Sequence, residues 1–190
     1  MKGKKTLIII VAILAIIGFS VGLVAGSYNS IVEAETNIET KQADIQTQLQ
    51  RRADLIPNFV ETVKGYSKYE KETLSAVTEA RAGVSKASNA DELSQASENL
   101  DKAISVWVNA VTEAYPELKA NTNYIALQDK LSGTENRIAV ARKDYNEAVQ
   151  TYNTMIKKFP KNIIAGMFNF EKADFFKADE NSQTVSGVEF

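Results

Sequence analysis

An apolar run from Leu7 to Ala25, without a single charge, constrains this chain more than any other feature of its sequence. In a helix that rises about 1.5 Å per residue, these nineteen residues span roughly 28 Å, close to the thickness of the hydrocarbon core of a bilayer. A cleaved signal peptide has a shorter apolar region, of about 7–15 residues. Because Val24-Ala25-Gly26 resembles a cleavage site, cleavage stays the alternative. We predict a transmembrane helix whose partner is the lipid bilayer.

The charges that flank this run predict its orientation. Lys2, Lys4 and Lys5 precede it, whereas the first charged residues after it are Glu33 and Glu35. Positive flanks stay on the cytoplasmic side, so we expect a cytoplasmic N-terminus and residues 28–190 outside. The next apolar run, residues 163–170, is too short for a second span.

Three glycines inside the run are spaced by four residues: Gly18, Gly22 and Gly26. A GxxxGxxxG pattern lets two helices approach closely in a membrane, which favours a transmembrane contact and a homo-oligomer. The alternative is the ordinary glycine content of a membrane span.

Beyond the run, apolar residues recur every three or four positions, the spacing of amphipathic helices. The sequence has only three prolines and nine glycines, which also favours long helices. Breaks are expected near Pro57, in residues 85–89 with Asn89 and Glu92 as an approximate capping box, at Tyr115-Pro116, and at Pro160. The four periodic segments are Tyr28, Ile31, Ile38, Ile45, Leu49, Ile56; Val60, Val63, Tyr66, Leu74, Val77, Val84; Leu93, Leu100, Ile104, Trp107, Val111, Leu118; and Tyr124, Leu127, Leu131, Ile138, Tyr145, Tyr152, Phe159.

We therefore predict an all-α chain, with an N-terminal transmembrane helix followed by an antiparallel four-helix bundle of long helices. An open coiled-coil stalk that pairs with other copies has the same pattern and is the alternative. The expected division is 1–27 for the cytoplasmic tip and transmembrane helix, 28–160 for the bundle and 161–190 for an aromatic C-terminal tail.

The tail is unusually rich in phenylalanine. Six of the eight lie in it or at its edge: Phe159, Phe168, Phe170, Phe175, Phe176 and Phe190. We favour a fold-back in which residues 168–176 cover the open end of the bundle. The alternative is an apolar patch for a partner or for the lipid interface.

The composition argues against several function classes. Without Cys or His, the chain lacks thiolate metal ligands and the commonest general base, and the glycines form no phosphate-binding loop. A net charge of -2 argues against nucleic-acid binding. We expect no enzymatic activity, no cofactor and no metal.

Polar residues gather in three stretches beside the apolar stripes, at 48–59, 115–128 and 134–153. Glu135 and Arg142 are seven residues apart and therefore lie on one helix face. We favour an ion-pair and hydrogen-bond network that fixes helix register. Second is a site in which arginines bind a carboxylate or a peptide, and a catalytic carboxylate pair is third. The candidate residues are Arg51, Arg52, Asp54, Asn121, Glu135, Arg142 and Asn146.

These stretches resemble the LemA family of bacterial membrane proteins. The resemblance covers residues 28–176 and rests on YNSIVEAE (28–35), QLQRRADLIPNFVETVKGY (48–66), AYPELKANTNYIALQ (114–128), and TENRIAVARKDYNEAVQTYN (134–153) with Phe159-Pro160. It implies a four-helix domain at the bacterial plasma membrane and no established activity. One departure is Asn169, where the resemblance leads us to expect a glycine between two aromatics.

The function that these observations favour is a non-enzymatic membrane scaffold or oligomeric assembly module. One rival is an accessory factor of envelope proteolysis or secretion that binds a peptide or protein partner through the polar residues. Another is a signalling component, which would act through a partner because only six residues precede the span.

Overall fold

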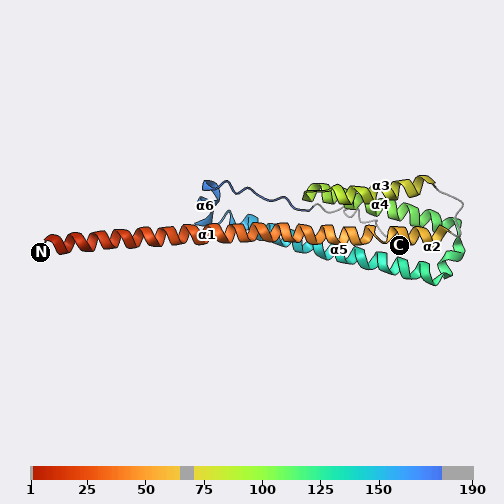
Figure 1. Cartoon of the computed structure of the whole chain (residues 1–190), viewed down its shortest axis with the longest axis horizontal. Coiled ribbons are helices and arrows are strands. Elements are labelled where there is room, and N and C mark those ends of the chain that lie inside the picture. The colour runs from red at the N-terminus through yellow and green to blue at the C-terminus, as the bar shows by residue number, and fades with distance from the viewer. Residues whose placement is uncertain (1, 65–70, 177–190) are drawn as a thin grey trace, which may run out of the picture. The chain divides into compact units, whose positions relative to one another are not determined.

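The computed structural model describes residues 2–64 and 71–176, and within them all regular structure is helical (Figure 1). The predicted all-α class is confirmed, and the antiparallel four-helix arrangement stays a prediction. The elements are α1 (Lys2–Ala53), α2 (Ile56–Lys64), α3 (Lys71–Lys86), α4 (Ala90–Ala114), the 3₁₀ helix η1 (Pro116–Ala120), α5 (Thr122–Met155) and α6 (Lys161–Met167).

Helix α1 runs for 52 residues without a break at Gly26-Ser27. The side chains of its apolar part that the structure describes are exposed, with Leu14 at 62% and Phe19 at 69%, and the first buried one is Ile31. Among the helices of the described residues, this one is long and apolar enough to cross a membrane by length and composition. An exposed helix that is apolar on all sides has the surface of a lipid-facing span.

The described residues form two compact units. Those within 1–39 and 147–173 form the first unit, and those within 40–146 and 174–190 form the second. The first unit therefore holds the apolar part of α1, the end of α5 and α6. The second holds the end of α1, α2 to α4, η1 and most of α5.

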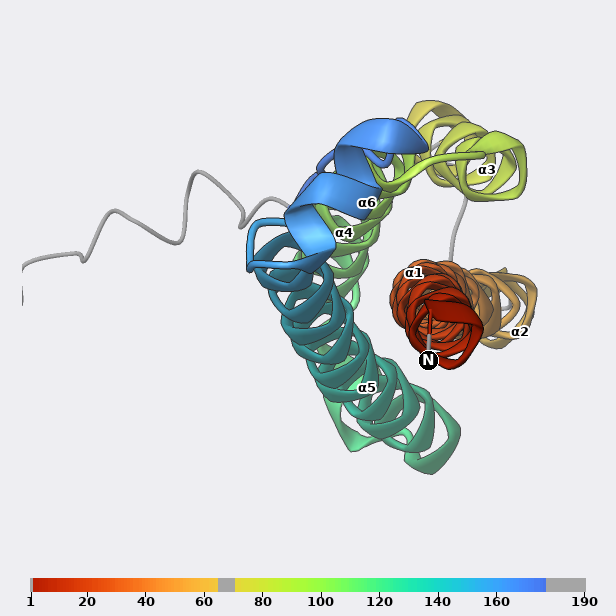
Figure 2. The ribbon, with the colours of Figure 1, turned by 90° about the vertical axis from the view of Figure 1, so that its left-hand side faces the viewer.

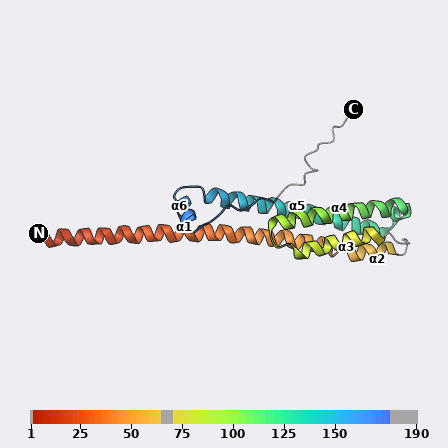
Figure 3. The same cartoon turned by 90° about the horizontal axis from the view of Figure 1, so that it is seen from above.

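Helices α3 and α4 of the second unit form a hairpin and lie side by side in all views (Figures 1, 2 and 3). The predicted turn lies between them. Asn89 Oδ1 accepts the N–H of Glu92 at 2.9 Å, and the Glu92 carboxylate accepts the N–H and hydroxyl of Ser88, both at 2.8 Å. The Ser88 N–H is the main reason why the pKa of Glu92 is lowered. The predicted capping box is present, with Ser88 as the residue that Glu92 binds.

The break at Pro57 is also confirmed, because α1 ends at Ala53 and Pro57 lies in the first turn of α2. The second periodic segment comprises two helices, α2 and α3, and Tyr66 lies outside the described residues. Phe59 of α2 packs edge-on against Trp107 and Tyr124, with ring centroids 4.8 and 5.1 Å apart. These rings form the aromatic core of the second unit.

The apolar stripe of α5 is buried as predicted from Tyr124 to Tyr152. Phe159 was predicted to continue it, and that prediction is wrong, because Phe159 is 80% exposed. Helix α5 ends at Met155, and its last turn tightens to i→i+3 hydrogen bonds from Lys157 to Thr154 and from Lys158 to Met155. A residue before proline avoids helical geometry, so the chain leaves the helix before Phe159.

Helix α6 ends at Met167, and Asn169, where we expect a glycine, lies two residues beyond that end. Asn169 has a φ of 56°, and the N–H of Phe170 bonds back to the carbonyl of Ala165 at 3.0 Å. This is the 6→1 bond of a Schellman cap, whose left-handed residue is usually glycine and sometimes asparagine. The departure at Asn169 therefore leaves the turn intact.

After α6, the tail folds back along the side of α5, and the part of the prediction in which residues 168–176 cover the open end of the bundle stays a prediction. In the first unit, the Tyr152 hydroxyl donates to the Glu171 carbonyl, and Asn153 makes two hydrogen bonds with Ala173. In the second unit, Asn146 makes two hydrogen bonds with the backbone of Phe176. Residues 177–190, including Phe190, lie outside the described residues.

Candidate functional site

The second unit contains an ion-pair cluster centred on Arg52, at the end of α1. Its guanidinium is 93% buried, with Nη1 2.8 Å from Asp101 Oδ1 of α4 and Nη2 3.7 Å from Glu135 Oε2 of α5. Arg52 sits three residues beyond the buried Leu49, so the apolar face of α1 carries it inward. One buried cation thus connects three helices.

Arg142 of α5 extends this cluster from the other side of Asp101. Its Nη2 lies 3.8 Å from Asp101 Oδ2 and donates to the hydroxyl of the buried Ser97 on α4. Asp101 therefore lies between two guanidinium groups. Glu135 supplies a second carboxylate, so the formal charges of Arg52, Arg142, Asp101 and Glu135 cancel.

The C-terminal segment covers Arg142. The guanidinium carbon lies 5.0 Å from the ring centroid of Phe176, a cation–π geometry, and Phe176 is only 4% exposed. The two amide hydrogen bonds of Asn146, at 2.8 and 3.2 Å, hold the backbone of Phe176 in that place. The tail is thus part of the cluster.

The structure brings together Arg52, Glu135, Arg142 and Asn146 of the seven residues singled out from the sequence. Asn121 has a different role, since its Oδ1 accepts the N–H groups of Asn123 and Tyr124 and caps the start of α5. Asp54 forms an exposed pair with Arg81, 3.1 Å apart. Arg51 is exposed and lies outside the cluster.

Sequence reasoning missed Asp101, Ser97 and Phe176. The spacing along α4 indicates an inward position for Ser97 and Asp101. These two residues are four apart, and Asp101 lies three residues before Ile104, so both are in register with the apolar stripe of α4. A buried arginine needs an acidic partner, so a carboxylate at such a position was a candidate.

This arrangement is suited to holding helices in register. Its guanidinium and carboxylate groups face each other, so they neutralise their own charges within the unit. Among the described residues, no group of three or more acidic side chains is placed to hold a metal ion.

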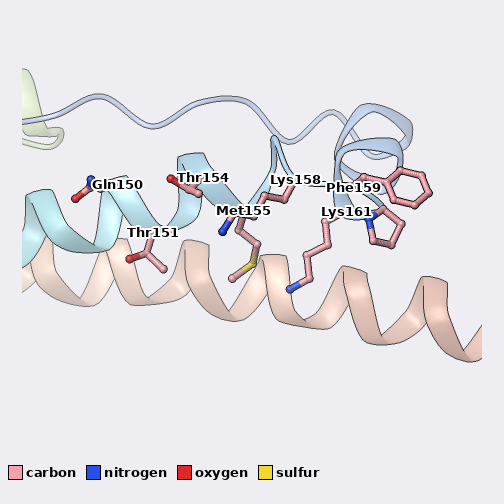
Figure 4. A pocket seen from close by; sticks show the side chains of 8 residues that line it. Gln150, Thr151, Thr154, Met155, Lys158, Phe159 and Lys161 are labelled. Atoms are coloured by element: carbon pink, nitrogen blue, oxygen red, sulfur yellow. The ribbon is translucent and has the colours of Figure 1, made fainter.

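A separate pocket of about 550 Å³ lies in the first unit, where α5 leads into α6. It combines the cationic Lys158 and Lys161 with apolar groups of Met155, Phe159 and Pro160. In Figure 4, Met155 and Lys161 extend toward one side of the chain, whereas the ring of Phe159 projects from the end of the turn. The pocket is therefore a cationic hollow beside exposed apolar groups.

Two tyrosines predict how the tail responds to alkaline pH. Burial raises the pKa of Tyr145 and of Tyr152 above the ordinary 10.0, with nearby carboxylates adding to the effect. The folded chain therefore keeps protons that the unfolded chain has lost, so stability is complete below pH 10 and falls as the pH rises further. A phenolate cannot donate to the carbonyls of Asp174 and Glu171, so the tail should detach.

Tyrosinate absorbance and chemical denaturation, both followed from pH 9 upward, check this prediction. The Tyr145→Phe/Tyr152→Phe variant is the matched control and should lose most of the alkaline dependence. If the wild-type chain and this variant lose stability in parallel above pH 10, the two hydroxyls do not hold the tail.

Comparison with known proteins gives one family and several distant relatives. A family model described as the LemA family matches residues 41–190. Protein LemA of Metamycoplasma hominis is 26% identical, over 94% of this chain and 81% of its own. Magnetosome proteins MamQ 2 of Paramagnetospirillum magneticum and MamQ of Magnetospirillum gryphiswaldense are 24% and 22% identical, over 93% and 92% of this chain and 74% and 73% of their own.

Proposed function

This chain belongs to the LemA family, and from that premise we propose that it is a non-enzymatic, single-pass membrane protein whose helical part serves as a scaffold or assembly module. The observation that carries the proposal is the course of α1. One helix contains both the exposed apolar run and the buried Arg52, so the anchor and the ion-pair cluster belong to the same element. The relatives, which include magnetosome proteins, support membrane association.

The ion-pair cluster supports a structural role over a catalytic one. Buried charged networks are best attested as devices that fix register and pairing. Here, the four charges pair with one another, and the tail covers Arg142. We therefore expect no enzymatic activity of the purified chain that depends on Arg52 or Glu135. An activity that is lost on substitution of either residue would contradict the structural role.

The proposed orientation places the N-terminus in the cytoplasm and the helical part outside. The chain has no cysteine, so single cysteines report topology without background. We expect Ser132→Cys, on the exposed side of α5, to react with a membrane-impermeant maleimide in intact cells, and Lys4→Cys to react only after lysis. The reverse pattern would overturn the orientation.

Self-association through the glycines of the span is the second part of the proposal. A methyl group added at Gly18, Gly22 or Gly26 would meet nothing within 4 Å, so packing inside the chain does not explain these glycines. Replacing Gly22 by leucine should block close helix contact and reduce the oligomer, measured as mass after mild detergent extraction.

Ser20→Leu is the matched control, because Ser20 lies on the other side of the helix from Gly18 and Gly22. It should leave the oligomer unchanged. A wild-type chain that is wholly monomeric in detergent and in native membranes would contradict self-association.

The alternative function is an accessory factor that binds a peptide or protein partner. One observation favours it: Asn146 holds the extended backbone of Phe176 with two hydrogen bonds, the way in which an amide side chain binds a peptide. Photocrosslinking in native membranes discriminates the two, from a label at residue 143, which is exposed on α5 near Asn146 and leaves the amide of Asn146 in place. A stable crosslink to an envelope protease or transporter favours the accessory factor. Crosslinks between two copies of this chain favour the scaffold.

A further inference from the structure

Exposed apolar side chains gather on α6 and on the turn before it. Phe159 is 80% exposed, Ile163 53%, Met167 67% and Phe168 50%. Ile163 and Met167 are four residues apart and share one face of α6, while Ile164 and Ala165 are buried and fix the helix on its own unit. We call the four exposed residues the α6 patch. Such a cluster on a small unit marks a surface that contacts something apolar.

The α6 patch lies next to the end of the apolar span. Tyr28 follows Ala25 by three residues, and its ring lies 4.8 Å from that of Phe168 and 5.6 Å from that of Phe170, between centroids. All of these residues belong to the first unit. Tyrosine and other amphipathic rings concentrate at the headgroup level of a membrane. If α1 crosses the bilayer, these ring contacts put α6 at the level of the headgroups.

The segment that carries the patch is basic, and the nearest acidic residues along the chain are Glu147 and Glu171. Residues 148–170 contain Lys157, Lys158 and Lys161 and no acidic residue. Lys158 and Lys161 line the 550 Å³ pocket together with Phe159, so cationic and apolar groups share one surface (Figure 4). Basic residues beside an apolar helix face are the signature of a segment that lies in the membrane interface.

We propose that the α6 patch lies in the membrane interface beside the span, where Lys158 and Lys161 bind the headgroups of anionic phospholipids. This gives the chain a second contact with the bilayer besides α1. The inference rests on the proposed function, because it needs α1 to be the anchor. A protein that covers the patch instead is the competing outcome of the test below.

The test uses the full chain, reconstituted into vesicles of anionic or zwitterionic phospholipid that contain no other protein. An environment-sensitive fluorophore is placed on a cysteine at Ile163 or at the exposed polar Asn162 next to it. Val140→Cys is the matched control, because Val140 is also exposed and apolar, at 59%, but belongs to the second unit. We expect lipids that carry a quencher near the headgroup to quench the labels at 162 and 163 and not the label at 140.

The lysines are tested with Lys158→Gln and Lys161→Gln, with Lys130→Gln on α5 as the control. Each of the first two should weaken the contact about fivefold at low ionic strength, in anionic vesicles only, since a lysine near such a surface contributes about 1 kcal/mol. Added salt should have the same effect as the substitutions.

The outcomes separate the inference from the proposed function. Flotation of the vesicles in a density gradient shows whether the chain is bound to them. A chain that does not float with the vesicles overturns both the anchor and the contact of the α6 patch. A chain that floats but whose labels at 162 and 163 stay in water overturns only the inference. Labels that are shielded from water in native membranes, but not in vesicles that contain this chain alone, also overturn the inference. They would show that another protein covers the patch.

Discussion

Asp101→Asn should lower the free energy of unfolding of the full chain by about 3 kcal/mol, because it leaves the guanidinium of Arg52 buried without its close partner. Arg52 is 93% buried, whereas Asp101 is about one third exposed and Glu135 is mostly exposed at 3.7 Å. Removing a partner from a buried pair costs about 3–5 kcal/mol, and the remaining contact with Glu135 places this case at the low end. Urea denaturation in detergent micelles, followed by circular dichroism, measures the loss.

The exposed pair of Asp54 and Arg81 in the same unit is the matched control. Its side chains are 54% and 40% exposed, so Asp54→Asn should cost less than about 1 kcal/mol. The double variant Arg52→Met/Asp101→Leu removes both charges of the buried pair and should recover part of the stability, since apolar residues of similar volume often replace buried ion pairs well, although Arg142 also loses Asp101. Equal losses for Asp54→Asn and Asp101→Asn would show that Arg52 does not depend on Asp101.

The same substitution bears on the function. If the cluster only holds α1, α4 and α5 in register, Asp101→Asn should weaken folding and leave the span inserted, because the span needs no contact with the cluster. If the cluster binds a partner, the double apolar variant should fold well and still lose that partner. Stability and partner capture, measured on the same two variants, therefore separate a structural cluster from a binding site.

Much of the helical structure could be predicted because burial follows spacing. Ile31, Ile38, Ile45 and Leu49 are all buried on one face of α1, as their spacing of seven, seven and four residues predicts. The end of α5 was harder, because the seven-residue register pointed to Phe159 while Pro160 ended the helix first. A local constraint there outweighed the periodic one.

The cluster could be predicted only in part, because pairing across helices is not encoded by spacing within one of them. Arg51 and Arg52 are neighbours in the sequence, but their side chains point in directions that differ by about 100° around the helix. Arg51 is therefore exposed, whereas Arg52 is buried. The register of Leu49 favoured Arg52. No pattern along α4, however, indicates that Asp101 meets Arg52 and Arg142, since that contact depends on how the helices pack.

Replacing Ile13 and Ile16 by arginine should prevent the apolar part of α1 from inserting, which we expect to be the largest single effect on this chain. Each arginine near the centre of a span costs about 2.5–3.5 kcal/mol and each lost isoleucine a further half, so the pair costs about 6 kcal/mol or more. Both isoleucines are exposed, at 50% and 65%, so no contact within the chain is lost with them. Alkaline extraction of membranes should therefore release the variant and retain the wild-type chain.

The control for this substitution is a pair of arginines at Asn37 and Thr47, which are exposed on the same helix beyond the apolar run. This control variant should stay in the membrane fraction. Full retention of the Ile13→Arg/Ile16→Arg variant would mean that the exposed apolar surface of α1 is not what holds this chain to the bilayer.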